Sequence, residues 1–176
     1  FGDSHAAQWF PALEQWAKSR HFQLIVLTKS SCPAIALPLK DNGAFKAQAC
    51  NQFRMNALKY IRQIHPDLVV IGNFEHYSDV TVSDYVTNSN FQFKYLLIRD
   101  TPWPNRDIPA CLTTKNQCTT PKPFMIPYKL PNIFDPVPLM CTSKCPAMVD
   151  GLVAYRDQTH ITVALSEHLA PELNLK

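Results

Sequence analysis

The chain has 176 residues, 46% of them hydrophobic, which is enough to build one globular domain with a sizeable core. Its formal net charge is only +3, and no basic run or base-stacking motif accompanies that charge, so a nucleic-acid-binding role is disfavoured. No apolar stretch reaches the roughly 18 residues that a membrane span requires. We expect a single domain over residues 1–176, and because the chain starts abruptly we expect it to be a piece of a longer protein.

Short apolar strands alternate with helical patterns along most of the chain. In chain order, the expected elements are the end of a first strand at Phe1, a helix over residues 5–20, a buried strand over 22–28, a helix over 44–64, a buried strand over 67–72, a weak helix over 78–90, a strand over 94–99, a last strand over 151–157 and a helix over 162–169. Pro11 fits the first helix only in or near its first turn. Apolar strands that alternate with helices are typical of a parallel sheet with helices on both faces.

Residues 102–146 interrupt this alternation. They contain ten of the fifteen prolines and four of the six cysteines. We interpret the segment as a long excursion over the surface of the same domain, since loops of this length are often functional.

The six cysteines follow one another in pairs that each bracket a loop. Nearest-neighbour pairing would join Cys32 with Cys50, Cys111 with Cys118, and Cys141 with Cys145. Three disulfides would place the protein in an oxidising compartment. Free buried thiols are one alternative. A zinc site is another, although the sequence has no CxxC pair to support it.

The opening residues, FGDSHAAQWF, place Ser4 between the end of a strand and the start of a helix. In an open parallel sheet this edge is where ligands bind. The backbone N–H groups of a helix start can hold an oxyanion, so a serine there can act as a nucleophile. Gly2 would allow a close backbone approach. The alternative is that Ser4 only caps the helix.

A second group of candidate residues lies in YRDQTHIT, near the other end of the chain. Asp157 and His160 are three residues apart, a spacing that lets their side chains meet in a turn. An acid that orients a histidine base is the support that a serine nucleophile needs. Both residues follow the last expected strand, and we therefore expect them at the same sheet edge as Ser4. The D-x-x-H pattern also arises by chance. His5 and His76 are candidates for lining the substrate pocket, and a first-turn position without contact to substrate is the alternative for His5.

Together these segments resemble the SGNH (GDSL-type) hydrolase superfamily. Its first sequence block is similar to FGDSH, and its last block is similar to YRDQTH. One branch is closer still: the extracytoplasmic SGNH domain of bacterial membrane acyltransferases of family three is similar to the stretches GDSHAAQWFPAL, LTKSSCPA, PDLVVI and CPAMVDGLVAYRDQTHIT.

The resemblance implies an α/β fold, specifically a flavodoxin-like three-layer α/β/α sandwich with a mostly parallel sheet. It implies a catalytic triad of Ser4, Asp157 and His160 in a serine-dependent O-acyltransferase, with acetyl as the usual group. The acyl group would pass through an acyl-serine to a hydroxyl of an extracytoplasmic glycan or cell-envelope molecule. The implied partner is an upstream membrane acyltransferase domain that delivers the acyl donor at the outer face of the bacterial cell membrane. No cofactor and no metal are expected.

The oxyanion donors depart from the superfamily pattern. The superfamily usually provides a glycine in its second block and the asparagine of G-x-N-D in its third. Here the second strand is followed by TKSSCPA, without glycine, and the third ends in IGNFEH. Asn73 is the nearest match to the asparagine, and the backbone N–H groups of Ser4 and His5 would supply other donors. A contribution from Ser30–Cys32 is a further hypothesis. The alternative for Asn73 is an ordinary loop residue.

Two other functions remain open at this point. A carbohydrate or acetyl esterase of the SGNH type would use the same three residues, and a catalytically silent glycan-binding module would keep the fold without the chemistry. Aromatic residues of the excursion would either form a sugar-stacking wall beside the site or pack the excursion onto the sheet. They are Trp103, Phe124 and Tyr128, together with Pro104.

Overall fold

The computed structural model describes residues 1–42, 46–75, 91–104, 106–114, 118–121 and 132–173. The chain falls into two compact units. The first comprises Phe1–Ala7, Ile25–Asp100 and Tyr128–Phe134, and the second comprises Gln8–Leu24, Thr101–Pro127 and Asp135–Lys176. The weak helix expected over residues 78–90 lies outside the described residues.

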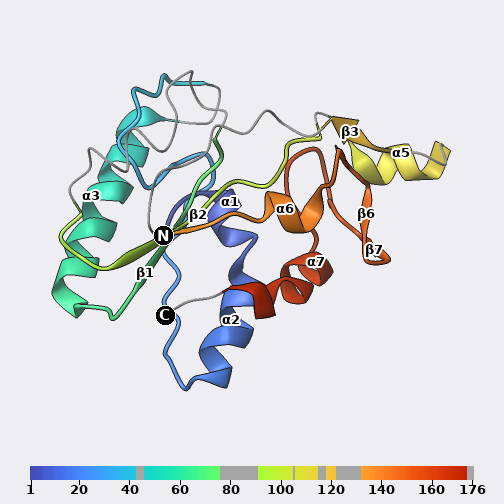
Figure 1. The fold of residues 1–176 in the computed structure, drawn as a ribbon. Coiled ribbons are helices and arrows are strands. Elements are labelled where there is room, and N and C mark those ends of the chain that lie inside the picture. Colours follow the sequence, from blue (N-terminus) through green and yellow to red (C-terminus); the bar gives the residue numbers. More distant parts are fainter. Residues whose placement is uncertain (43–45, 76–90, 105, 115–117, 122–131, 174–176) are drawn as a thin grey trace. The chain divides into compact units, whose positions relative to one another are not determined.

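A parallel sheet organises the first unit (Figure 1). Its strands, in spatial order, are β1 (Val69–Gly72), β2 (Tyr95–Ile98) and β4 (Ile133–Phe134). β1 pairs with β2 from Val69 opposite Tyr95 to Gly72 opposite Ile98, and β4 continues the parallel pairing along β2. The start of the chain joins the sheet as well, because Gly2 forms parallel bridges to Gly72 and to Thr28. The predicted α/β class with a parallel sheet is therefore confirmed.

α3 (Ala47–Ile64) packs against this sheet (Figure 1). Its residue Ile61 joins Ile71 of β1 and Leu97 of β2 in one buried apolar cluster. The helix ends at His65, which adopts a left-handed φ of 45° while its N–H donates to the carbonyl oxygen of Ile61 at 3.2 Å. The predicted helix over 44–64 is confirmed from residue 47 onward.

The first residues of the chain pass very close to the end of β1. The N–H of Gly72 donates to the carbonyl oxygen of Phe1 at 3.2 Å, and the N–H of Gly2 donates to that of Leu27 at 3.2 Å. A Cβ atom on Gly2 would lie 1.9 Å from the carbonyl oxygen of Gly72, and the φ of Gly2 is 152°. Only glycine fits this position.

Short helices and two-stranded ribbons form the second unit. Its elements are α2 (Phe10–Ser19), α5 (Ile108–Thr114), α6 (Val137–Met140), α7 (Val163–His168), the 3-10 helix η1 (Ala170–Glu172), and the antiparallel pairs of β3 (Thr120–Pro121) with β5 (Lys144–Cys145) and of β6 (Met148–Val149) with β7 (Leu152–Val153). α2 packs against α7 and η1 (Figure 1). The predicted C-terminal helix is confirmed as α7, and Thr162 caps it by accepting from the N–H of Leu165 at 3.1 Å.

The first predicted helix is divided into two. α1 (Ser4–Ala7) and α2 are separated by Gln8 and Trp9. Pro11 lies in the first turn of α2, where a missing N–H leaves no bond unmade. In one continuous helix the Pro11 ring would clash with the carbonyl group of Ala7. The break between α1 and α2 therefore follows from Pro11. Its place in the first turn of a helix was predicted, but the division of the helix into two was not.

One predicted strand is wrong, and another is confirmed only in part. In residues 22–28 only Thr28 forms a bridge, and both Phe22 and Val26 are 47% exposed. The last predicted strand, over residues 151–157, is confirmed only as β7, which pairs with β6 and not with the parallel sheet.

The excursion over residues 102–146 also differs from its prediction. It supplies β4, the third strand of the parallel sheet, and so is not confined to the surface. β4 has only two residues, which is too short for an apolar pattern to reveal it.

The nearest-neighbour pairing of the cysteines is confirmed. Disulfides join Cys32 with Cys50, Cys111 with Cys118, and Cys141 with Cys145. No cysteine is left as a free thiol, so the alternatives of buried thiols and a zinc site are wrong.

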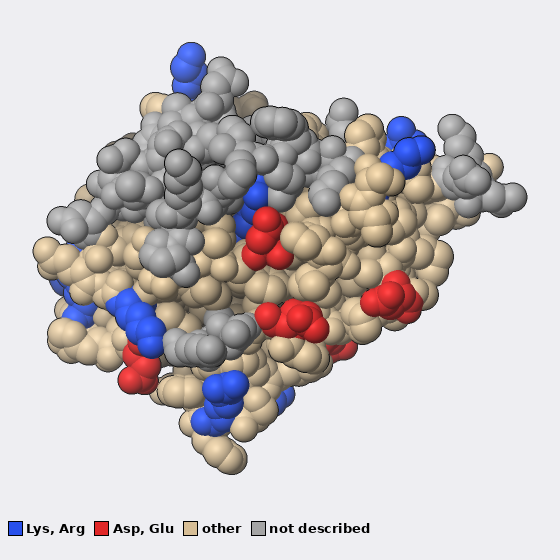
Figure 2. Space-filling view, viewed as in Figure 1, with Lys and Arg blue, Asp and Glu red and all other residues tan. Residues whose placement is uncertain are grey.

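Lys and Arg side chains do not gather into one patch on the face shown in Figure 2. Among the described residues in that view they stand at separate places, among uncharged and acidic side chains. In the described part of the chain, no helix has both the length and the apolar character that crossing a bilayer demands.

Candidate active site

Asp3, and not Ser4, caps the first helix. Its Oδ1 accepts a hydrogen bond from the N–H of His5 at 2.8 Å, and its carbonyl oxygen accepts from those of Ala6 and Ala7 at 3.2 and 3.1 Å. Ser4 is the first residue of α1 and is partly buried. Among the residues that the structure describes, neither the hydroxyl nor the N–H of Ser4 makes a hydrogen bond. The capping interpretation of Ser4 is therefore wrong, and its hydroxyl is not engaged in holding the helix.

Asp3 also connects the turn of Ser4 to the loop after β1. Its Oδ2 accepts from the N–H of Phe74 at 2.9 Å, and Asp3 itself is fully buried. Asn73 directly precedes Phe74 at the carboxyl end of β1. The structure thus links the loops that carry Ser4 and Asn73, both within the first unit.

The Asn73 side chain is buried and oriented by one hydrogen bond. Its Oδ1 accepts from the N–H of Ala34 at 2.6 Å, and the residue is only 2% exposed. Because a backbone N–H can only donate, the acceptor must be the amide oxygen, which assigns the other atom as Nδ2. Nδ2 is buried and has no acceptor within the described residues. A buried donor without a partner costs free energy, and Nδ2 has the capacity to donate a hydrogen bond to a bound group.

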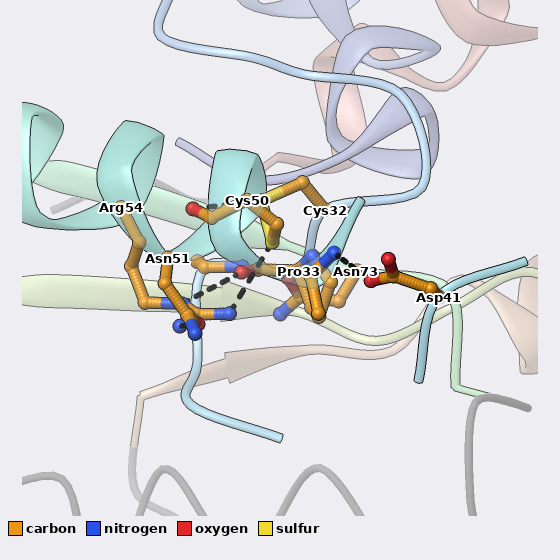
Figure 3. The surroundings of a disulfide bond; sticks show 9 residues. Cys32, Pro33, Asp41, Cys50, Asn51, Arg54 and Asn73 are labelled. Atoms are coloured by element: carbon orange, nitrogen blue, oxygen red, sulfur yellow. Dashed lines mark hydrogen bonds between the residues drawn. A yellow bond between two sulfur atoms is a disulfide. The ribbon is translucent and has the colours of Figure 1, made fainter. Parts of the chain in front are cut away.

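The segment after Thr28, which lacks the glycine of the superfamily's second block, holds the side chain of Asn73 through the N–H of Ala34. Ala34 follows Cys32 and Pro33, and the disulfide from Cys32 to Cys50 holds this segment to α3 (Figure 3). Ser30 and Ser31 are exposed and make no hydrogen bond to Asn73 in the described structure.

Arg54 of α3 provides a second attachment for the same segment. It is buried, and its Nε donates to the carbonyl oxygen of Pro33 at 3.2 Å (Figure 3). Its two terminal nitrogens donate to Asn51 Oδ1 at 2.8 Å and to Cys50 Sγ at 3.4 Å. Burial lowers the pKa of the Arg54 guanidinium. The disulfide and Arg54 together hold the backbone N–H that orients Asn73.

His5 has a partner that the sequence analysis missed. Its Nδ1 lies 2.6 Å from Oδ1 of Asp100, its ring packs against that of Phe74 with centroids 4.7 Å apart, and the residue is 5% exposed. Asp100 lies two residues after the end of β2, so an acidic residue close to a strand end was the available signal. The N–H of His5 is already bonded to Asp3, which removes it from the expected oxyanion donors.

Asp157 and His160 form a pair in the second unit, as their spacing predicts. The ring Nδ1 of His160 lies 2.8 Å from Asp157 Oδ2, while Asp157 Oδ1 accepts from the N–H groups of Thr159 and His160, each at 2.8 Å. These bonds close a tight turn between Tyr155 and Ile161, which form an antiparallel bridge. Burial by itself would raise the pKa of Asp157, but the bonds from the two N–H groups and from the His160 ring together lower it.

The remaining candidates divide by their place in the structure. His76, Phe124 and Tyr128 lie outside the described residues, and Trp103 is 38% exposed. Ser4 and Asn73 belong to the first unit, whereas Asp157 and His160 belong to the second, so their convergence stays a prediction. Within the described part of the chain, no group of three or more His, Cys, Asp or Glu residues is placed to hold a metal ion.

Comparison with known proteins adds a family and a fold. The sequence profile of a family described as "SGNH domain (fused to AT3 domains)" matches residues 1–174. Among solved structures, the periplasmic domain of a lipopolysaccharide acetyltransferase from Salmonella ser. Paratyphi A is similar, with a TM-score of 0.68 over 98% of this chain and 79% of that chain. The sequence identity is 16%, so this likeness concerns the fold. No curated protein sequence is similar enough to match.

Proposed function

The chain belongs to the family of SGNH domains that are fused to AT3 domains, and on that premise we propose that it is a serine-dependent O-acetyltransferase domain. The acceptor is a hydroxyl of an extracytoplasmic glycan or cell-envelope molecule. The solved structure of similar fold comes from a lipopolysaccharide acetyltransferase, which supports acetyl as the group and a glycan as the acceptor. One profile spans both compact units, which supports treating them as one SGNH domain.

The partner in this proposal is a membrane acyltransferase domain upstream of the chain, which delivers the acyl donor. The family's fusion to AT3 domains supports that partner. The three disulfides support a location on the extracytoplasmic side of the membrane, because disulfides persist in oxidising compartments.

The observation that carries the proposal is the connection of Ser4 to Asn73 through Asp3. A serine whose hydroxyl is not used for capping stands one residue after the carboxylate that binds the loop of Asn73. That loop presents a buried amide nitrogen with no acceptor among the described atoms. Acyl transfer needs a nucleophile together with a donor that is free to bind the carbonyl oxygen under attack, where negative charge develops. The link through Asp3 supports these roles for Ser4 and Asn73.

In the acylation step, His160 is the base. With its Nδ1 proton held by Asp157, Nε2 is the basic nitrogen, and it accepts the Ser4 proton as Oγ attacks the carbonyl carbon of the donor. Asn73 Nδ2 and the Ser4 N–H bind the resulting oxyanion. The tetrahedral intermediate then collapses, the bond to the leaving group breaks, and His160 returns the proton to that group.

In the transfer step, the acceptor takes the place of the leaving group. His160 removes the proton of the acceptor hydroxyl, whose oxygen attacks the carbonyl carbon of the acyl-serine. Collapse breaks the ester bond to Ser4 and reprotonates its hydroxyl. The acyl group leaves on the acceptor, and the enzyme is restored.

Chain connectivity supports the convergence of Ser4 with His160. Gln8 lies four residues after Ser4 in the sequence. Within the second unit, its Oε1 accepts from the N–H of Ile161 at 2.9 Å, and Ile161 directly follows His160.

Treatment with an aryl sulfonyl fluoride tests the nucleophile. We expect mass spectrometry to find the adduct on Ser4, and we expect S4A to lose the adduct and to lower the turnover of an aryl acetate about 10⁴-fold. S19A, which changes an exposed serine at the end of α2, is the control and should behave as the unmodified chain. An S4A variant that keeps most of its hydrolysis would show that the nucleophile is misassigned.

Product analysis then separates the remaining functions. With oligosaccharide acceptors present, the transferase forms O-acetylated sugar. Free acetate as the main product at high acceptor concentration would favour the esterase. Absence of both labelling and hydrolysis would favour the glycan-binding module.

A further inference from the structure

Asp100 is a buried carboxylate that the proposed reaction does not use. It is 6% exposed, and both of its oxygens are bonded. Oδ1 lies 2.6 Å from His5 Nδ1, and Oδ2 accepts from the N–H of Glu75 at 3.1 Å. The N–H of Asp100 in turn donates to Glu75 Oε1 at 3.0 Å. Asp100 therefore connects the loop after β2 both to α1 and to the loop after β1.

Asp3 makes a parallel connection between the same two segments. One of its oxygens binds the N–H of His5 and the other binds the N–H of Phe74. Each carboxylate thus has one bond to His5, next to Ser4, and one bond to a backbone N–H just after Asn73.

The bonds of Asp100 and Asp3 matter because α1 is too short to be stable or to keep its position without tertiary contacts. It has four residues, and a helix of one turn is not stable in isolation. The orientation of Ser4 therefore depends on tertiary bonds to α1. Misplacement of a reacting group by about 1 Å can cost roughly 100-fold in rate.

We propose that Asp100 and His5 are positioning residues that fix Ser4 relative to the Asn73 amide. The inference rests on the proposed function, because it assumes Ser4 as nucleophile and Asn73 as oxyanion donor. Neither Asp100 nor the His5 ring needs to touch the substrate in this role. The imidazole of His5 connects α1 to the loop after β2, because its Nδ1 binds the carboxylate of Asp100.

A double-mutant cycle tests the role of Asp100. We expect D100N to lower the kcat for aryl acetate hydrolysis roughly 10- to 100-fold with KM changed less than about twofold, because alignment and not ground-state binding is lost. N73A should lower kcat about 10²- to 10³-fold. In the N73A background, D100N should cost less than about threefold, because the donor that it aligns is already absent.

Two His5 variants test the link itself. The Nδ2 of an asparagine can occupy nearly the same place as the histidine Nδ1, so H5N should retain most of the activity. H5L has no donor and should lose as much as D100N. If the His5 ring instead contacted substrate, H5N and H5L would be impaired equally.

D41N is the matched control for the charge change. Asp41 caps a different helix, α3, by accepting from the N–H of Ala47 at 2.9 Å, and D41N should leave kcat unchanged. Circular dichroism and intact-mass determination of the three disulfides check that each variant folds. Should D100N fail to fold, the H5N and H5L pair decides alone.

The inference is overturned if D100N costs as much with N73A as without it, if D100N raises KM alone, or if H5N is as impaired as H5L. Sulfonyl fluoride labelling of Ser4 distinguishes a failure of this positioning role from a failure of the proposed function. If Ser4 is labelled in the unmodified chain and D100N has an unchanged kcat, only the positioning role is rejected. Unlabelled Ser4 in the unmodified chain would reject the proposed function as well.

Discussion

At the scale of single residues, Asp3 caps α1 and leaves the Ser4 hydroxyl available for its proposed role as nucleophile. A serine that caps a helix commits its hydroxyl oxygen to a backbone N–H. Here the Asp3 carboxylate accepts from the N–H of His5 at 2.8 Å. The Ser4 hydroxyl one residue later can then serve as a nucleophile without weakening the start of α1.

Asp157 gives a residue-scale prediction about pH. Hydrogen bonds to its carboxylate lower its pKa in the folded chain, so the stability that they provide is present above the ordinary carboxyl pKa of about 4. That stability is lost as the pH falls through the lowered, folded-state value. We expect D157N to have a lower urea midpoint than the unmodified chain at pH 6, and the difference between the two to shrink steadily toward pH 2.

The control for this measurement is D67N, at an exposed aspartate just before β1. It should shift the urea midpoint little at any pH. A D157N difference that stays constant from pH 6 to pH 2 would mean that the carboxylate bonds do not stabilise the fold.

At the scale of elements, the loop after Thr28 lacks the glycine of the superfamily's second block but contacts Asn73 through another backbone N–H. The segment after Thr28 contributes no glycine N–H, but the N–H of Ala34 sets the orientation of the Asn73 amide at 2.6 Å. α3 holds that segment through the Cys32–Cys50 disulfide and through Arg54. α3, which carries no candidate catalytic residue, therefore supports the segment that orients the proposed oxyanion donor.

R54M tests this support. It removes the donor to the carbonyl oxygen of Pro33 and leaves that buried acceptor unpaired, which should destabilise the fold by about 1–3 kcal/mol. It should also lower kcat, because the loop of Ala34 is held less firmly. Urea unfolding and aryl acetate hydrolysis provide the two readouts.

R62M, an exposed arginine on the same helix, is the matched control and should change neither quantity. An R54M variant with normal kcat would show that the disulfide alone holds the loop in place.

At the scale of the whole molecule, the candidate triad draws on both compact units. Ser4 and Asn73 lie in the first unit, and Asp157 and His160 lie in the second. The rate at which Ser4 is labelled therefore tests whether His160 activates it. We expect H160Q to lower the rate of sulfonyl fluoride labelling at Ser4 by about 10²-fold or more, because the base that activates the serine is lost.

H168Q is the control for this prediction. His168 belongs to the same unit, and its Nε2 lies 2.9 Å from Asp150 Oδ2 in an exposed pair, so its loss should leave the labelling rate unchanged. Equal labelling rates in H160Q and the unmodified chain would argue that another residue activates Ser4.

Local patterns predicted a large part of this molecule. α3, β1, β2 and α7 follow from apolar periodicity, and the disulfides follow from pairs of cysteines no more than 18 positions apart. The Asp157–His160 pair could be predicted for the same reason, since its members are three positions apart. The limit of such patterns shows at residues 22–28, which form no strand, and at 151–157, where β7 lies outside the parallel sheet. An apolar run does not specify the strand with which it pairs.

The sequence by itself therefore determined the α/β class, the cysteine pairs and the acid–histidine pair, all of which depend on neighbours along the chain. Only the tertiary structure decided that Asp3 caps α1, that Ala34 orients Asn73 and that Asp100 binds His5. The last two contacts join residues 39 and 95 positions apart. A single hydrogen bond between two distant loops produces no periodic pattern in the sequence. It depends on the spatial order of the strands that carry the loops, and not on which residues are neighbours along the chain.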